Sequence, residues 1–276
     1  MRILITGAGG QLGQDLQAVL RDEEVDARDR RALDISDAEA VLALVKEIRP
    51  DWVINAAAFN DVDRAERAAE EAFAVNARGP ANLASAAADV DAGLVHISTD
   101  YVFDGTKGTA YTEEDQPNPL SVYGRSKYQG ERAVLESTAS ACVLRTAWLY
   151  GVHGKNFVKA ILEKAKEGRP LDVVADQVGS PTSTRDLAEA INRLIRTRAH
   201  GLFHVANAGA CSRFEFAKAI VRGAVEVRPI TSAQASRPAP RPENSSLSSV
   251  RWPSLGLPPL RPWQAALDDF LDAIAV

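Results

Sequence analysis

The chain has 276 residues, of which 46% are hydrophobic and 25% charged, and its formal net charge is -5. These values are ordinary for a soluble globular protein of one or two domains, and the negative charge gives no electrostatic case for nucleic acid or an anionic membrane. The first residues read as a strand rather than a signal peptide, and no apolar stretch is long enough to span a bilayer. We therefore expect a cytoplasmic enzyme or binding protein.

Short apolar runs alternate with helical patterns through the first half of the chain. The runs at residues 3–6, 52–55, 94–98, 142–146 and 171–174 predict buried strands, and the patterns at 37–48, 82–88 and 122–136 predict helices. This alternation indicates an α/β fold with a Rossmann-type, doubly wound parallel sheet that is covered on both faces.

The last third of the chain is less regular. Helices are predicted at 157–167, 184–196, 213–221 and 263–275. Between the last two lies a stretch rich in proline and serine, 237–262, whose composition is typical of a linker, although the amphipathic helix after it also fits an ordered loop. We expect a dinucleotide-binding domain at 1–150, with a returning strand and helix near 171–196, and a smaller, mainly substrate-binding mixed α/β domain at 151–276.

Glycines at three-residue spacing join the first strand to the first helix. Gly7, Gly10 and Gly13 match G-x-x-G-x-x-G, a variant of the dinucleotide fingerprint. Gly7 would allow the tight turn, Gly10 the close approach of a pyrophosphate, and Gly13 the packing of the helix. The free N–H groups at the start of the helix would face the phosphates. The alternative is a glycine-rich turn without a ligand.

The end of the second strand decides between two nicotinamide cofactors. The segment VDARDRRALDIS holds Arg28, Arg30 and Arg31, which could bind a 2′-phosphate, and Asp29, which could bind a ribose. We favour NADP(H) over NAD(H) on the three arginines, and a plain charged surface turn is the alternative.

Polar side chains follow the strand at 94–98, where an open α/β sheet binds its ligands. Ser98 and Thr99 both carry a hydroxyl that could bind a substrate oxygen, and strand alternation does not decide between them. His96 lies inside the strand and fits a packed core histidine better than a catalytic one.

Tyr123 and Lys127 share one face of the helix predicted at 122–136, because they are four residues apart. A nearby ammonium would lower the pKa of the tyrosine toward the working pH, which would make Tyr123 a usable general acid. A pair on a helix surface is the alternative.

Together these elements resemble the extended short-chain dehydrogenase/reductase family, and within it the dTDP-4-dehydrorhamnose reductases. The matching segments run over nearly the whole chain: ILITGAGGQLG, VINAAAFNDVDRAE, AVNARGPANLA, HISTDYVFDG, PLSVYGRSKYQGE, VLRTAWLYG, GKNFV, DVVADQVGSPT and PRPENSSL. The resemblance implies that a nicotinamide delivers hydride to C4 of a dTDP-linked 4-keto-6-deoxysugar.

The same resemblance implies roles for individual residues. The catalytic residues would be Tyr123, Lys127 and Thr99, with Tyr123 and Lys127 also touching the cofactor. The other cofactor contacts would be Gly7, Gly10, Gln11, Leu12, Gly13, Asp34, Ile35, Ala56, Ala57 and Ala58. The substrate contacts would be Thr99, Asp100, Trp148, Asn156, Arg241 and Asn244. Plain alternatives are a strand end and helix cap at 34–37, close packing at the alanines, and a solvated loop around 241–244.

Several readings stay open within this resemblance. Phe59-Asn60 departs from the family pattern beside the cofactor cleft. Some relatives dimerise through magnesium, and Asp15 and Glu189 lie in comparable places, but we predict no metal, and a monomer or homodimer. The alternatives to the reductase are a sister enzyme such as dTDP-dihydrostreptose synthase, an epimerase or dehydratase, and a non-catalytic regulatory subunit of methionine adenosyltransferase.

Overall fold

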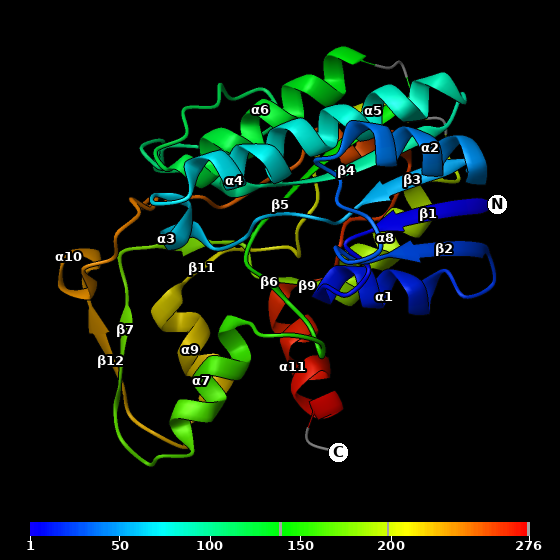
Figure 1. The fold of residues 1–276 in the computed structure, drawn as a ribbon. Helices are drawn as coiled ribbons and strands as arrows, with labels where there is room; N and C mark the ends of the chain where they lie inside the picture. Colours follow the sequence, from blue (N-terminus) through cyan, green and yellow to red (C-terminus); the bar gives the residue numbers. More distant parts are fainter. Residues whose placement is uncertain (138–139, 198, 275–276) are drawn as a thin grey trace.

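The computed structural model describes residues 1–137, 140–197 and 199–274 (Figure 1). A six-stranded sheet with the order β10-β5-β4-β3-β1-β2 forms its centre, and every neighbouring pair is parallel. Its strands are β1 (Arg2–Thr6), β2 (Glu24–Arg28), β3 (Trp52–Asn55), β4 (Gly93–Thr99), β5 (Ala141–Thr146) and β10 (Gly201–His204). The chain runs from β1 outward to β2 and then crosses to β3, so the switch point at which such sheets bind ligands lies between β1 and β3.

Helices cover both faces of this sheet (Figure 1). On one face, α1 (Gln11–Val19) and α8 (Thr184–Leu194) pack Leu16 and Ile191 into the core. On the other face, α2 (Ala38–Ile48), α5 (Gly79–Asp89) and α6 (Val122–Ser137) contribute Val41, Leu83 and Val134. The predicted sheet covered on both faces is therefore confirmed. The short helices α3 (Val62–Ala65) and α4 (Ala69–Phe73) and the π-helical turn Ala74–Arg78 lead into α5.

The part after β5 has a core of its own below the sheet (Figure 1). Tyr150, Phe216 and Trp263 lie at its centre. It contains α7 (Phe157–Ala165), α9 (Arg213–Val221), α10 (Ser232–Ala235), α11 (Trp263–Ile274) and three two-stranded sheets. These sheets pair β7 (Leu171–Val174) with β12 (Val227–Ile230), β8 (Val178–Gly179) with β11 (Cys211–Ser212), and β6 (Leu149–Tyr150) with β9 (Thr182–Ser183). No helix in the described ranges is long and apolar enough to cross a membrane.

One expectation about the sheet is wrong. The strand predicted near residue 171 forms as β7, but it pairs with β12 away from the central sheet. The strand that completes the central sheet beside β5 is β10, which the sequence did not indicate. An apolar run predicts that a strand exists but not which strand it pairs with. The returning helix does pack on the sheet, as α8 against α1. Residue 275, at the end of the last predicted helix, lies outside the described residues.

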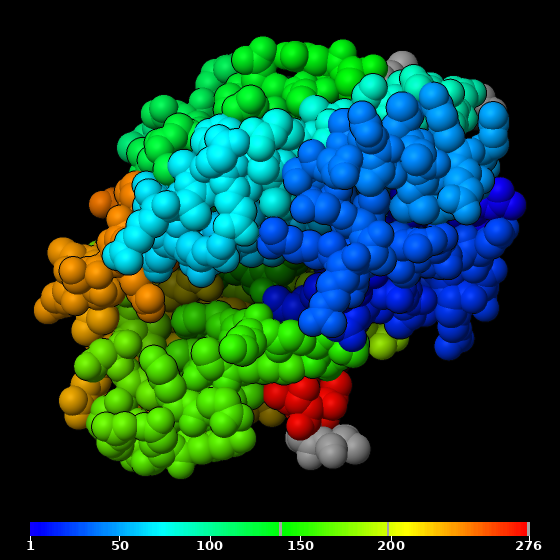
Figure 2. Space-filling view, viewed as in Figure 1, coloured from blue at the N-terminus to red at the C-terminus, as the bar shows by residue number. Residues whose placement is uncertain are grey.

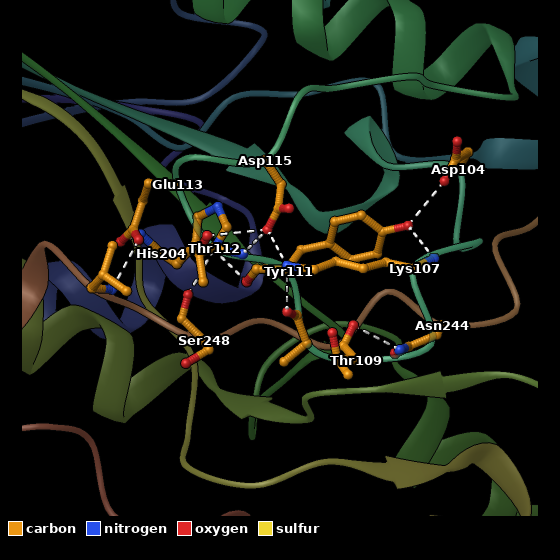
Figure 3. A network of polar contacts seen from close by, with 12 residues as sticks. Asp104, Lys107, Thr109, Tyr111, Thr112, Glu113, Asp115, His204, Asn244 and Ser248 are labelled. Carbon is orange, nitrogen blue, oxygen red and sulfur yellow. Dashed lines mark hydrogen bonds and ion pairs between the residues drawn. The ribbon is translucent and has the colours of Figure 1, made fainter.

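The proline- and serine-rich stretch 237–262 is an ordered loop. Figure 3 shows its residues Asn244 and Ser248 beside Tyr111. The Tyr111 N–H donates to the Ser246 carbonyl at 2.8 Å, and the Ser248 N–H donates to the Tyr111 carbonyl at 2.8 Å. The Asn244 amide donates to the Thr109 carbonyl at 2.9 Å. The sequence left a linker and an ordered loop as alternatives. The structure shows the ordered loop, because backbone hydrogen bonds fix it to the segment after β4.

Candidate active site

The glycine turn after β1 has the backbone that its sequence predicts. Gly7 has a φ of 73°, and a Cβ atom there would lie 2.5 Å from the Ala57 nitrogen. A Cβ atom at Gly13 would lie 2.7 Å from the Ala8 Cα. Gly10 is the N-cap of α1 and no side chain caps its N–H groups. Because these groups lack a side-chain partner, the start of α1 can accept an anionic ligand.

Two connected cavities lie at the carboxyl ends of the strands, and both are bordered by Gly10, Ala56, Ala58 and Asn60. The inner cavity, of about 260 Å³, is also lined by Gln11, Leu12, Ile97, Ser98, Thr99, Asp100, Tyr123, Lys127, Thr146, Ala147, Trp148 and Leu149. The outer cavity, of about 350 Å³, is also lined by Gly7, Gly9, Asp29, Arg30, Arg31, Leu33, Asp34, Ile35, Ala57, Phe59 and Val75. Figure 2 shows the molecule hollowed between the blue-to-cyan N-terminal part and the green segment below it.

The charged residues that follow β2 differ in whether they border the outer cavity and in how they are paired. Arg30 and Arg31 border it, whereas Arg28 forms an ion pair with Asp26, with one N–O distance of 2.9 Å. Asp29 accepts hydrogen bonds from the N–H groups of its own turn, at 2.9 and 3.0 Å. Arg30 also pairs with a carboxylate, that of Glu71 at 3.4 Å, so among the described residues Arg31 is the arginine that borders this cavity without an ion-pair partner.

Asp34 and Ile35 form the far wall of the outer cavity. The Asp34 carboxylate accepts hydrogen bonds from the hydroxyl and the N–H of Ser36, and these bonds lower the pKa of Asp34. Ile35 is buried against Gly79, where a Cβ atom would lie 2.6 Å from the Ile35 Cδ1. Asp37, three residues after Asp34, caps α2. The helix cap is therefore Asp37, and the carboxylate of Asp34 stays at the cavity.

Tyr123, Lys127 and Thr99 meet at the inner cavity. The Thr99 hydroxyl lies close enough to Tyr123 to lower its pKa against the larger, opposite effect of burial, and the Lys127 ammonium donates to the Ile97 carbonyl at 2.5 Å. Burial lowers the pKa of Lys127 to about 8. Burial also raises the pKa of Tyr123, so the expectation of a lowered tyrosine pKa is wrong. The cost of burying a phenolate is the main cause of this shift, the charge of Asp100 adds to it, and Tyr123 therefore holds its proton.

The structure decides between the two hydroxyls at the end of β4. The Ser98 hydroxyl donates to the Glu131 carboxylate at 2.5 Å, and Thr99 is the hydroxyl that reaches Tyr123. Thr99 also donates to Asp100 at 3.1 Å, and Ser245 donates to Asp100 at 2.5 Å. Burial raises the pKa of Asp100 to about 6. Thr99 and Asp100 therefore border the cavity, and Ser245 of the 237–262 loop holds the Asp100 carboxylate from behind.

Trp148 borders the inner cavity, and its ring packs against a cation that the sequence did not suggest. Trp148 has a φ of 48°, a left-handed conformation that is uncommon for a side chain of this size. The Arg213 guanidinium lies 3.5 Å from the centre of its ring. The charges of Arg213 and Arg241 both act on Tyr101 and on each other, so the two cations lie close together near the cavity. No spacing pattern links Arg213 to Trp148, because the two residues come from separate elements.

Comparisons with known proteins agree with this geometry. A family model described as RmlD substrate binding domain matches residues 1–276. This chain belongs to the dTDP-4-dehydrorhamnose reductase family. It is 46% identical over 99% of its length to the dTDP-4-dehydrorhamnose reductase of Mycolicibacterium smegmatis, of which it covers 86%. It is 44% identical over its full length to a probable dTDP-4,6-dihydroxy-2-methyloxan-3-one 4-ketoreductase of Streptomyces antibioticus, of which it covers 96%.

A solved structure of the dTDP-4-dehydrorhamnose reductase family also matches the whole fold. The enzyme from Bacillus anthracis, in complex with NADP, superposes with a TM-score of 0.96 at 42% identity, over 99% of each chain. The fold predicted from the strand and helix pattern is therefore confirmed.

Three residues that the family resemblance assigned to the substrate are bonded to their own chain. Asn156 caps α7 and donates to the Gln11 side chain at 3.0 Å. Arg241 pairs with Asp63 through two hydrogen bonds of 3.0 Å. Asn244 donates to the backbone of residue 109, as described above. None of the three borders the two cavities.

His96 and the acidic residues compared with magnesium-dependent members of the family lie apart from the two cavities. His96 is fully buried in β4 and hydrogen-bonds to the Asn55 amide at 3.0 Å. Asp15 and Glu189 border a separate groove of about 740 Å³ between α1, α8 and α11. There Asp15 accepts a hydrogen bond from Thr184. Within the described ranges, no group of three or more His, Cys, Asp or Glu residues is placed to hold a metal ion.

Proposed function

We propose that this chain is a dTDP-4-dehydrorhamnose reductase, which reduces the C4 keto group of dTDP-4-dehydro-6-deoxy-L-mannose to give dTDP-L-rhamnose. The observation that carries this proposal is the meeting of Tyr123, Lys127 and Thr99 in a cavity that opens onto the glycine turn. Family membership over the full length of the chain supports it. In this reading, residues 1–150 hold the cofactor and residues 151–276 mainly hold the sugar nucleotide.

The turn and the outer cavity fit a dinucleotide. A Cβ atom would fill the space at Gly7, and the start of α1 has no side-chain cap. The reduced nicotinamide, when bound, supplies a hydride. The residues that would hold the dinucleotide are Gly7, Gly10, Gln11, Leu12, Gly13, Asp34, Ile35, Ala56, Ala57, Ala58, Tyr123 and Lys127. We propose NADPH as the preferred form, because Arg30 and Arg31 border the outer cavity where a 2′-phosphate would lie.

The proton comes from the chain itself. Tyr123 keeps its proton at neutral pH and donates it to the C4 oxygen as negative charge develops there. Thr99 borders the cavity beside Tyr123 and orients the carbonyl. Lys127 places a positive charge one helical turn away, which stabilises the phenolate that remains after proton transfer. The new C–H bond and the new O–H bond together complete the reduction.

The sugar nucleotide would lie against the wall that carries the two arginines. Thr99, Asp100 and Trp148 would contact the sugar, since they border the inner cavity. Arg213 and Arg241 would hold the diphosphate, because paired guanidinium groups suit phosphate oxygens. Asn156 and Asn244 would act from behind this wall, because each is bonded to its own chain.

The test adds dTDP-4-dehydro-6-deoxy-L-mannose to the protein and NADPH and measures NADPH oxidation by the decrease in absorbance. A parallel assay uses NADH. We expect stoichiometric loss of NADPH, and a fall in kcat of at least about 100-fold for Tyr123→Phe with NADPH binding retained. An epimerase would show no net consumption, and a regulatory subunit would bind the cofactor without turnover. Either result would refute the proposal.

A second candidate function is the reduction of another dTDP-linked 4-keto sugar. The observation that favours it is the 44% identity to the probable 4-ketoreductase of Streptomyces antibioticus, close to the value for the rhamnose enzyme. Comparing kcat/KM for the two keto sugars decides between the candidates. The higher value identifies the substrate of this chain.

A further inference from the structure

A buried carboxylate lies directly behind the candidate catalytic residues. Glu131 is four residues after Lys127 on α6, and its side chain is 1% exposed. The Arg145 guanidinium, on β5, donates two hydrogen bonds to it, at 2.9 and 2.7 Å. The Ser98 hydroxyl donates a third, at 2.5 Å. Nothing in the proposed chemistry uses this carboxylate, and it borders neither cavity.

Stability alone is a weak reason for this ion pair. Removing two charges from water costs several kcal/mol per ion, and replacing such a pair with apolar residues is often neutral or stabilising. The pair therefore calls for an explanation in terms of what it holds in place.

Two hydrogen bonds join α6 to the end of β4. One is donated by the candidate catalytic residue Lys127, and the other by Ser98, the neighbour of the candidate catalytic residue Thr99. The Lys127 ammonium donates to the carbonyl of Ile97, and Ser98, the next residue, donates to Glu131. Thr99 follows Ser98 and meets Tyr123 on the same helix. The bond to Glu131 engages the Ser98 hydroxyl, whereas Thr99 is the hydroxyl that acts on Tyr123.

We propose that Glu131 is a positioning residue for the reduction: it fixes the end of β4 against α6, and it places a buried negative charge one helical turn from the Lys127 ammonium. This inference rests on the proposed function for the roles of Tyr123 and Lys127.

The groups around Lys127 are consistent with this role. Glu131 is the charge that opposes the effect of burial on the pKa of Lys127. His96 faces Lys127 from β4, and burial lowers its pKa well below the usual value, so it is neutral. Arg145 faces Glu131 from β5 and is held by it. Without the Glu131 charge, the pKa of Lys127 would fall below 8, and Lys127 would lose its proton at a lower pH.

The experiment compares pH profiles of three variants. Glu131→Gln keeps the shape and removes the charge, and Ser98→Ala removes the hydrogen bond and keeps the charge. Glu136→Gln is the matched control, because Glu136 forms an exposed pair with Arg132 on the same helix. The readouts are kcat and KM with NADPH and the keto sugar from pH 6 to 10.

For Glu131→Gln we expect the alkaline limb of kcat to move down by about one pH unit or more, with less than about a threefold change in KM. For Ser98→Ala we expect a lower kcat at every pH with the limb unmoved, and for Glu136→Gln no change. If Glu131→Gln does not fold, the Glu131→Gln/Arg145→Gln double variant replaces it, since it leaves no unpaired charge. A limb that coincides with that of the wild type would overturn the inference.

A second readout does not depend on the sugar. In protein labelled with ¹³C-lysine, the Lys127 Cε resonance, assigned with Lys127→Arg, should titrate at a lower pH in Glu131→Gln than in the wild type. A wild type that reduces no keto sugar refutes the proposed function, whereas an unmoved Lys127 titration refutes the role of Glu131. The two failures are therefore distinguishable.

Discussion

Replacing Gly13 with alanine should destabilise the chain and weaken NADPH binding together. Helix propensity alone favours alanine over glycine by about 1 kcal/mol, so a loss of stability would have to come from contacts. The added Cβ would lie 2.7 Å from the Ala8 Cα and closer still to the Gly7 carbonyl oxygen, whereas real Cβ atoms essentially never approach within 3.0 Å. Both neighbours are backbone atoms, so the whole turn has to move.

Overpacking of this kind costs about 1–3 kcal/mol, and because both clashes are with backbone atoms we take the upper end. Subtracting the helix-propensity gain of about 1 kcal/mol leaves a net loss near 2 kcal/mol. For a chain of this size, that loss corresponds to a fall in Tm of about 4–8 °C. Displacement of Gly7 and Gly10 should also raise the Kd for NADPH at least about tenfold. Gly9→Ala is the matched control for stability, because its Cβ would lie 3.6 Å from the nearest atom, an ordinary contact. A Gly13→Ala variant that melts higher than the wild type and binds NADPH normally would refute the reasoning.

Three further predictions concern charged residues. Asp100 has a pKa raised to about 6, so its contribution to stability is present below its ordinary pKa of 3.8 and is lost as pH rises through 6. Asp100→Asn should therefore be more stable than the wild type at pH 7 to 8, by at most about 3 kcal/mol in the free energy of unfolding. Thermal melts below pH 4 should show no difference in stability between the two proteins. Arg31→Ala should raise the Kd for NADPH about tenfold and leave that for NADH unchanged, as fluorescence titration would measure. Equal effects on both cofactors would contradict the 2′-phosphate site. Arg213→Met should raise KM for the sugar nucleotide about tenfold or more without changing KM for NADPH, whereas Arg213→Lys should keep part of the affinity. Steady-state kinetics that show Arg213→Met equal to the wild type would exclude Arg213 from the diphosphate site.

The parts of the site that the sequence predicts are those coded by local patterns. Gly7 and Gly13 need only the strand before them and the helix after them, and Tyr123 and Lys127 need only helical spacing. Parallel strands bring their carboxyl ends to one edge, so the sequence also predicts that Thr99 lies near these residues.

The parts that the sequence does not predict depend on contacts between distant segments. The choice of Thr99 over Ser98 depends on Glu131, which accepts the hydrogen bond of the Ser98 hydroxyl although Ser98 also borders the cavity. The partner of β7 is β12, from a segment more than fifty residues later. The direction of the pKa shift of Tyr123 depends on burial, which the neighbouring Lys127 does not reveal.

The 237–262 loop has a consequence for the order in which the chain matures during synthesis. The end of β4 is made early, yet Asp100 receives a hydrogen bond from Ser245. The outer edge of β5 remains open until β10, which ends at residue 204 of 276, emerges from the ribosome. The nascent Rossmann half therefore exposes an unpaired strand edge for about three-quarters of translation and an incomplete substrate wall for nearly nine-tenths of it, a period in which chaperones have the most to protect.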